Sequence, residues 1–204
     1  LLEMVAAYAV FMNGGIYTEP MVVDKIIDRK GDVIAEFIPL KRRSLTQETA
    51  WLMMYMLRGG FEEPGGTSLG LWDYKFVRGN QVGGKTGTSS NYSDGWYMGV
   101  TKDFVTGVWV GADDNRVRFR SSETGEGART ALPVYGKYMD LNYADKSLGL
   151  TKGNFPDPVV KITRKHNCRT IIAVVDTVVG PISNDSLVEV PVENIPLKEA
   201  PTIE

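Results

Sequence analysis

Three strand-like segments lie close together in the middle of the chain and constrain its fold more than any other feature. They cover residues 81–88, 96–100 and 105–111. The connectors between them, at 89–95 and 101–104, are short, and short connectors are typical of antiparallel hairpins. The sequence therefore predicts antiparallel strands in this region.

Helical and hairpin patterns surround these strands. Apolar spacing and end signals predict three helices, at residues 1–12, 44–57 and 128–143. In the second helix we expect Ser44 to be the N-cap, Gln47 to be its capping-box partner and Gly59-Gly60 to be the stop. A hairpin is expected at 21–38, followed by a solvated basic loop at 41–43. This order predicts an α+β fold in which helices flank an antiparallel sheet.

The character of the sequence changes after Leu150. Residues 155–158 resemble a linker, and β-type runs follow at 159–163 and 170–179. We therefore divide the chain into a main part, residues 1–150, and a β-rich C-terminal extension, residues 151–204, whose role the sequence does not indicate.

Composition excludes several classes of protein. Of 204 residues 43% are hydrophobic and 24% are charged, which is ordinary for a globular domain. The net charge of −2 does not favour nucleic acid as a partner. A single cysteine, Cys168, forms no intrachain disulfide, and with His166 it offers too few ligands for a metal site. No metal or cofactor is expected. No apolar segment reaches the length of a membrane span, and the helical pattern at Leu1 suggests a fragment of a longer protein.

The segment 79–88 has two competing interpretations. Residues 79–86 fit the phosphate-loop pattern G-x-x-x-x-G-K-[ST], and Asp176 could serve as a magnesium-binding partner. A phosphate loop needs a helix directly after Thr86, however, and the residues that follow are typical of turns. Nucleotide binding is therefore the less favoured alternative.

The second interpretation places Lys85-Thr86-Gly87 on a strand at the edge of an active site. Alternation along a strand puts Lys85 on the face opposite to Thr86 and Thr88. Gly87 lets a substrate backbone lie close to the strand, and an exposed edge can pair with an extended peptide. The hydroxyls of Thr86 and Thr88 could bind a terminal carboxylate, and Lys85 could supply positive charge for proton transfer. The Thr88 N–H could form half of an oxyanion hole.

The residues around this triplet match, in order, a longer set of motifs. The matching segments are Glu3–Ala9 with Asn13–Gly15, Gly66-Thr67, Gly84–Thr88, Asp94–Gly99, Val108–Asp113, and Ala131–Pro133 with Tyr138-Met139. Together they resemble the class A penicillin-binding proteins, and the resemblance covers residues 1–143. It implies that the main part is the C-terminal portion of a penicillin-binding transpeptidase domain.

The resemblance also implies a fold, a reaction and a location. The fold would be that of serine β-lactamases and transpeptidases, an antiparallel sheet flanked by helices. An active-site serine would attack the D-Ala-D-Ala bond of a peptidoglycan stem peptide, and the acyl-enzyme would pass to an amine of a second stem. β-Lactam antibiotics would acylate the same serine. The parent protein would act at the extracytoplasmic face of the bacterial cytoplasmic membrane.

One part of the family pattern is missing from the chain. None of its serines has a lysine three positions later, so S-x-x-K is absent, and Ser89-Ser90-Asn91 spells S-x-N only after Lys85, where it is typical of a turn. We therefore expect the isolated chain to be inactive and to need the N-terminal part of the same protein. Apolar surface left exposed without that part could produce a homo-oligomer. An alternative is a non-catalytic module that binds cell-wall peptide or another protein.

Overall fold

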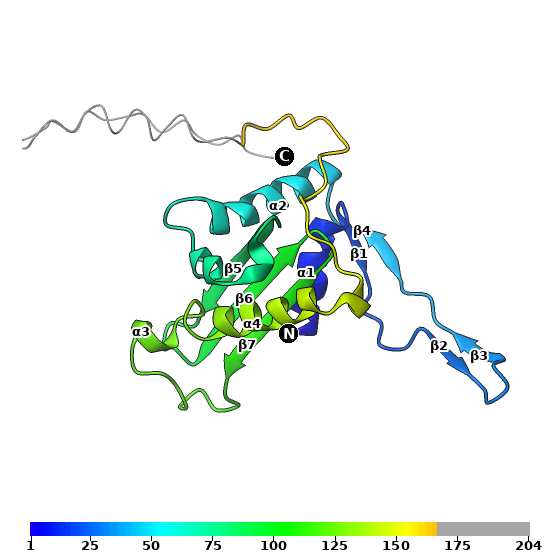
Figure 1. The fold of residues 1–204 in the computed structure, drawn as a ribbon, viewed down its shortest axis with the longest axis horizontal. Coiled ribbons are helices and arrows are strands. Elements are labelled where there is room, and N and C mark those ends of the chain that lie inside the picture. Colours follow the sequence, from blue (N-terminus) through cyan, green and yellow to red (C-terminus); the bar gives the residue numbers. More distant parts are fainter. Residues whose placement is uncertain (167–204) are drawn as a thin grey trace, which may run out of the picture. The chain divides into compact units, whose positions relative to one another are not determined.

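The computed structural model describes residues 1–166, and Leu1–Arg164 form one compact unit. At its centre lies an antiparallel sheet of β5 (Val82–Thr88), β6 (Asp94–Thr101) and β7 (Val105–Gly111), in that order (Figure 1). Strand β6 pairs with both neighbours in continuous register, Gly87 opposite Trp96 and Trp96 opposite Trp109. The predicted antiparallel strands are confirmed.

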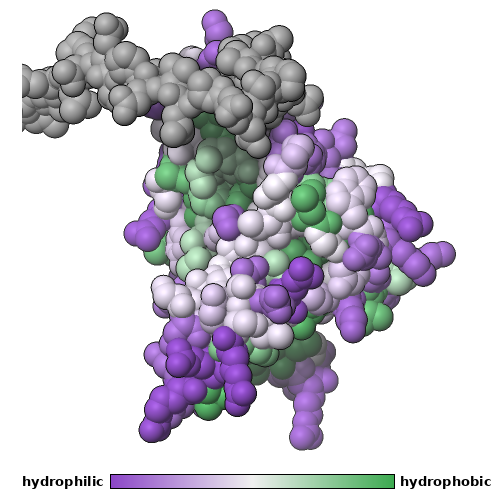
Figure 2. Space-filling view, turned by 90° about the vertical axis from the view of Figure 1, so that its left-hand side faces the viewer, coloured by the Kyte–Doolittle hydropathy of each residue, from purple (hydrophilic) through white to green (hydrophobic). Residues whose placement is uncertain are grey.

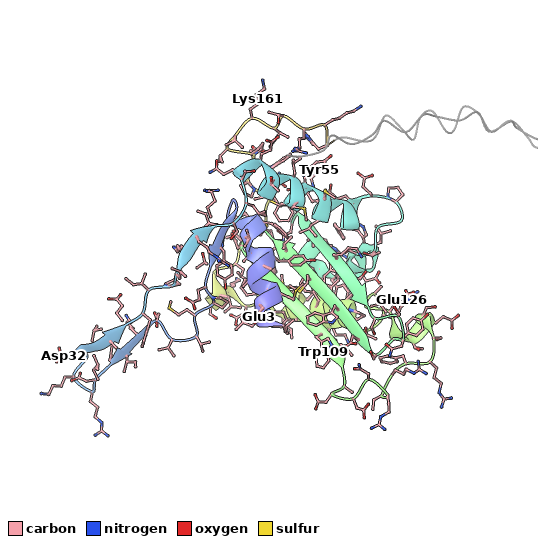
Figure 3. All side chains as sticks on the ribbon, turned by 180° about the vertical axis from the view of Figure 1, so that it is seen from behind. Glu3, Asp32, Tyr55, Trp109, Glu126 and Lys161 are labelled. Carbon is pink, nitrogen blue, oxygen red and sulfur yellow. The ribbon has the colours of Figure 1, made fainter. Side chains whose placement is uncertain are left out.

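Helices cover both faces of this sheet. Helix α1 (Leu2–Met12) lies on one face and α4 (Ala131–Ala144) on the other, as Figures 1 and 3 show from opposite sides, and both contact β6 and β7. Helix α2 (Gln47–Glu62) packs along β5. Pro133 falls in the first turn of α4, where its missing N–H would have no intrahelical partner anyway. The arrangement confirms the predicted α+β class.

Both ends of α2 differ from the prediction. The N-cap is Thr46, whose Oγ1 accepts a hydrogen bond from the Thr49 N–H at 3.1 Å, so the expected Ser44–Gln47 capping box is wrong. The helix also continues through Gly59-Gly60 to Glu62. A Cβ on Gly60 would lie 2.6 Å from the carbonyl oxygen of Gly84. The glycine therefore allows the helix to pack against the strand instead of stopping it.

Two small strand pairs lie outside the central sheet. Strand β2 (Lys25–Ile27) pairs with β3 (Val33–Glu36), which confirms the expected hairpin over a shorter length; Asp32 lies at its projecting tip in Figure 3. Strand β1 (Ile16–Thr18) pairs with β4 (Lys41–Arg43). The basic run at 41–43 is therefore an exposed strand and not the loop that we expected.

The core lies between the sheet and the helices. One cluster joins β5 and β6 to α4 and to the short helices η1 (Leu69–Asp73) and η2 (Lys75–Val77), and a smaller one joins α2 to β6. The most deeply buried large side chains are Tyr97, Tyr135, Phe76, Leu71 and Met139. The short helices α3 (Ser122–Gly125) and η3 (Lys146–Leu148) flank α4 in the chain.

The chain after α4 returns across the compact unit. The Gly153 N–H donates to Asn80 Oδ1 at 3.1 Å, the Phe155 N–H donates to Gln81 Oε1 at 2.8 Å, and the Phe155 side chain is buried. The compact unit thus extends past the boundary expected at residue 150. Residues 159–163 form no strand, so that prediction is wrong, whereas the run at 170–179 lies outside the described residues.

No helix within residues 1–166 combines the length and the apolar character that a bilayer crossing requires.

Candidate functional site

Strand β5 places Lys85–Thr88 at a half-open edge of the sheet. Within the described part of the chain, β6 is its strand partner on one side only. Helix α2 covers the first half of β5, because a Cβ on Gly83 would lie 3.0 Å from the α2 backbone at Leu57 and Arg58. The second half is not covered in this way, and its residues are exposed or half-buried.

The open edge presents the backbone groups of alternate residues. The carbonyl oxygen of Gly84 faces α2, and Lys85 Nζ donates to the carbonyl oxygen of Thr86 at 2.9 Å. Since backbone groups of every second residue on an antiparallel strand point to the same side, those of Thr86 and Thr88 point away from β6. The amide predicted for the oxyanion hole therefore lies on the free side of β5.

Lys85 faces a small apolar pocket of about 280 Å³ beside helix α1. The pocket is lined by Met4, Tyr8, Lys85, Thr86, Gly87, Trp96 and Met98. Within residues 1–166 no carboxylate forms an ion pair with Lys85; its ammonium group contacts the carbonyl oxygen and, at 3.4 Å, the hydroxyl of Thr86. The positive charge of a lysine lowers the pKa of a nearby group that gives up a proton, because it favours the anion that forms.

Thr86 and Thr88 line a second, larger pocket of about 690 Å³. It lies between β5, the loop after α2 and the start of α4; the face of the molecule in Figure 2 shows many pale, weakly polar residues between charged side chains. Lys85 lines only the first pocket and Thr88 only the second, whereas Thr86 lines both. This agrees with the predicted alternation of Lys85 and Thr88.

Within residues 1–166, neither the Thr86 nor the Thr88 hydroxyl donates its proton to a hydrogen bond. The Gly127 N–H donates to Thr88 Oγ1 at 3.0 Å, and Lys85 Nζ donates to Thr86 Oγ1 at 3.4 Å. A hydroxyl that already accepts can still donate its own proton. The two side chains therefore suit a ligand that accepts hydrogen bonds, such as a carboxylate.

Gly87 has a structural use beside the predicted one. A Cβ on this residue would lie 3.1 Å from the Cβ of Trp96 on β6, and a Cβ on Gly127 would lie 2.4 Å from the carbonyl oxygen of Gly87. The missing side chain of Gly127 lets the loop before α4 pack directly on the backbone of β5. That packing brings the loop to the pocket of Thr86 and Thr88.

A tight turn follows β5 and excludes a phosphate loop. Ser89 Oγ accepts from the N–H groups of Ser93 at 3.0 Å and Asp94 at 2.9 Å, and Tyr92 adopts a φ of 59°. The chain then enters β6 without a helix, so no helix N-terminus follows Thr86 to hold phosphate. The nucleotide-binding alternative is therefore wrong, and its proposed partner Asp176 lies outside the described residues.

Asp94 is a structural residue at the start of β6. Its carboxylate accepts from the Ser93 hydroxyl at 2.7 Å and from the Trp109 indole Nε1 at 2.9 Å. These two hydrogen bonds, the Ser93 bond first, hold the pKa of Asp94 below its ordinary value. The Trp109 contact orients that ring on the sheet face, 6.4 Å from the ring of Trp96.

Sequence reasoning missed two charged residues beside the site, Glu126 and Arg129. Both line the pocket of Thr86 and Thr88 but lie about forty residues further along the chain. No local motif marks them, because only the packing of Gly127 on β5 brings them there. In the part of the chain that the structure describes, no three His, Cys, Asp or Glu side chains form a metal-binding group.

Comparison with known proteins identifies the family of the chain. Residues 1–125 match the family described as penicillin binding protein transpeptidase domain. Penicillin-binding protein 1A of Aquifex aeolicus is 34% identical over 140 residues, which are 69% of this chain and 18% of that protein. Its namesake from Clostridium acetobutylicum is 31% identical over 159 residues, 78% of this chain and again 18% of the relative. The chain thus spans less than a fifth of the length of these relatives.

Solved structures show the same fold. The crystal structure of penicillin-binding protein 1A from Haemophilus influenzae superposes with a TM-score of 0.62 at 28% identity and covers 77% of this chain and 28% of that one. The transpeptidase domain of a peptidoglycan glycosyltransferase from Eggerthella lenta superposes at 0.52 and 23% identity, covering 70% and 32%. The profile match, the sequence relatives and the shared fold agree: this chain belongs to the penicillin-binding protein transpeptidase family.

Proposed function

We propose that this chain forms one wall of a D,D-transpeptidase active site that cross-links peptidoglycan stem peptides through an acyl-serine intermediate. The observation that carries this proposal is the half-open edge of β5. There Lys85 lines one pocket and Thr88 lines another, on the two sides of a single strand, and Thr86 between them lines both.

In the proposed complex an extended peptide ending in D-Ala-D-Ala lies along this edge. The outward backbone groups of Thr86 and Thr88 pair with the peptide, as in strand addition to a sheet. The hydroxyls of the same two residues donate to the terminal carboxylate. The reacting carbonyl is then next to the Thr88 N–H, which stabilises the oxyanion of the tetrahedral intermediate.

The nucleophile comes from outside the 204 residues, because the chain contains no S-x-x-K. The serine oxygen attacks the carbonyl of the penultimate D-Ala and forms an ester, and the terminal D-Ala leaves with the proton on its amine. An amine of a second stem then attacks the ester and releases the serine. The positive charge of Lys85 favours the loss of the serine proton. A β-lactam acylates the same serine when its ring amide opens.

The proposal extends to the parent protein. In it this chain would act together with a polypeptide that carries S-x-x-K, at the extracytoplasmic face of the bacterial cytoplasmic membrane, where stem peptides are cross-linked. The missing S-x-x-K also favours a second candidate, a module that binds the peptide without reacting with it.

Nuclear magnetic resonance of the 204-residue chain tests the shared first step. On addition of an acetylated peptide ending in D-Ala-D-Ala, we expect the largest shifts at the amides of Thr86 and Thr88. The same peptide ending in L-Ala-L-Ala is the matched control and should shift them less. Largest shifts on the β2–β3 hairpin, or equal shifts with both peptides, would exclude binding along β5.

A further inference from the structure

We propose that Arg129 selects ligands with a free carboxylate in the pocket of Thr86 and Thr88. This inference rests on the proposed function, since it assigns a specificity-determining residue to the same peptide site. Nothing in the sequence around Arg129 marks it as a site residue. The structure alone brings it to β5.

The loop that carries Arg129 is fixed to β5 by short contacts. The Gly127 N–H donates to Thr88 Oγ1 at 3.0 Å, and Gly127 packs on the backbone of Gly87 and Trp96 with no room for a side chain. The Arg129 N–H then donates to the carbonyl oxygen of Glu126 at 2.8 Å. These contacts therefore fix the backbone of Arg129 relative to Thr88.

The charges around the pocket favour this role for Arg129. Of the described residues that line it, Arg129 is the only cation and Glu126 the only acid. Arg129 forms no ion pair within residues 1–166, although Arg58 and Arg116 each pair with a nearby carboxylate. Arg129 is an exposed residue, so its charge is available to a ligand, while Glu126 opposes anions and sets a limit to the affinity.

The donors in the pocket match a carboxylate in kind and number. The hydroxyls of Thr86 and Thr88 already accept hydrogen bonds and have their own protons to donate. A guanidinium adds two parallel N–H groups that fit the two oxygens of a carboxylate. A neutral carboxamide would place its own NH₂ group against these donors.

The two cations at the strand then have different tasks. Lys85 faces the apolar pocket beside α1 and is bound to the carbonyl oxygen of Thr86. Arg129 lines the pocket that Thr88 also lines. Proton transfer at the nucleophile is assigned to Lys85, and recognition of the peptide end is assigned to Arg129.

The test compares two peptides that differ only at the C-terminus. Dissociation constants of the 204-residue chain are measured by magnetic resonance titration with acetyl-Lys-D-Ala-D-Ala as the free acid and as the C-terminal amide. We expect the acid to bind about tenfold more tightly, as one charge-assisted hydrogen-bonded pair allows. Arg129→Gln should remove most of that preference, and Arg129→Lys should retain part of it because it retains the charge.

Arg29→Gln is the matched control, since Arg29 lies in the turn of the β2–β3 hairpin and lines no part of this pocket. Loss of the acid preference in Arg129→Gln and its retention in Arg29→Gln would support the inference. An unchanged preference in Arg129→Gln would overturn it and leave the proposed function standing. Failure of the unaltered chain to bind either peptide would overturn both.

Discussion

At the scale of single residues, two buried tyrosines in the core differ in what their hydroxyls contact. The rings of Tyr97 and Tyr135 lie 4.7 Å apart, and burial raises the pKa of both side chains. Tyr97 Oη donates to the buried Ser68 Oγ at 3.0 Å, whereas Tyr135 Oη has no hydrogen-bond partner in the described residues. The first hydroxyl is satisfied and the second is not.

We therefore predict opposite results for two conservative substitutions. Tyr97→Phe leaves Ser68 buried without its partner and should lower the free energy of unfolding by about 1–3 kcal/mol. Tyr135→Phe removes an unsatisfied polar atom from an apolar site and should leave the free energy of unfolding unchanged or raise it. Urea unfolding of both variants measures the difference, and an equal loss in both would refute this assignment.

The hydrogen bonds to Asp94 predict a dependence on pH. Because the folded state lowers the pKa of Asp94, the carboxylate form is favoured by folding. This contribution to stability is complete above the unfolded-state pKa and is lost as the pH falls through the lower folded-state pKa. Trp109, which donates to Asp94, should report the change in its fluorescence. Asp94→Asn should abolish that acidic transition; a variant that still shows it would point to another group.

At the scale of elements, the contact between α2 and β5 depends on a single position in a glycine pair. A Cβ on Gly60 would meet the carbonyl oxygen of Gly84 at 2.6 Å, but a Cβ on Gly59 would meet only the Cγ of Glu63, at an ordinary 3.6 Å. Both residues are helical. The two positions therefore differ in packing while sharing the same backbone conformation.

This difference predicts opposite signs for two alanine substitutions. Gly60→Ala should lower the free energy of unfolding by about 1–3 kcal/mol, because the helix must move away from the strand. Gly59→Ala should raise it by about 0.5–1 kcal/mol through the better helix propensity of alanine. Thermal or urea unfolding measures both, and a stabilised Gly60→Ala variant would contradict the close packing of α2 on β5.

The elements that sequence predicted well are those defined by local pattern. The central strands, the first and last helices and the hairpin follow from alternation, spacing and turn residues that lie within each segment. The pairing of β1 with β4 joins residues 16–18 to 41–43 across a hairpin, so no local pattern reveals it. The continuation of α2 through Gly59-Gly60 likewise depends on the backbone of a strand more than twenty residues away.

The same distinction applies to the candidate site. Lys85, Thr86, Gly87 and Thr88 lie on one strand, and alternation was enough to predict that Lys85 and Thr88 lie on opposite sides of it. Arg129 reaches the pocket only because Gly127 packs on β5. Residues whose contribution depends on long-range packing were therefore outside what the motifs could show.

At the scale of the whole molecule, the compact unit exposes large apolar side chains. On the segment around the β2–β3 hairpin, Val22, Ile34 and Ile38 are 92%, 67% and 88% exposed. Self-association of the chain stays a prediction, which light scattering tests. A mass above that of the 22.5 kDa monomer, increasing with concentration, would agree with it, and a strictly monomeric chain would contradict it.

The active site that we propose is divided between two lengths of polypeptide. In that proposal this chain contributes the edge of β5 with Lys85, Thr86 and Thr88, and the nucleophile belongs to a segment outside its 204 residues. The family match covers residues 1–125, and the chain spans 18% of the Aquifex relative. A chain that contains only part of a transpeptidase domain is expected to carry only part of the active site.

Intact-mass spectrometry after incubation with a penicillin tests this division most directly. The chain alone should gain no mass. When it is joined to a transpeptidase segment that carries S-x-x-K, we expect one covalent adduct on the serine of that segment, with acylation at least tenfold slower in Lys85→Ala. An adduct on a serine of the isolated chain would contradict the account, as would Lys85→Ala acylation at the unaltered rate.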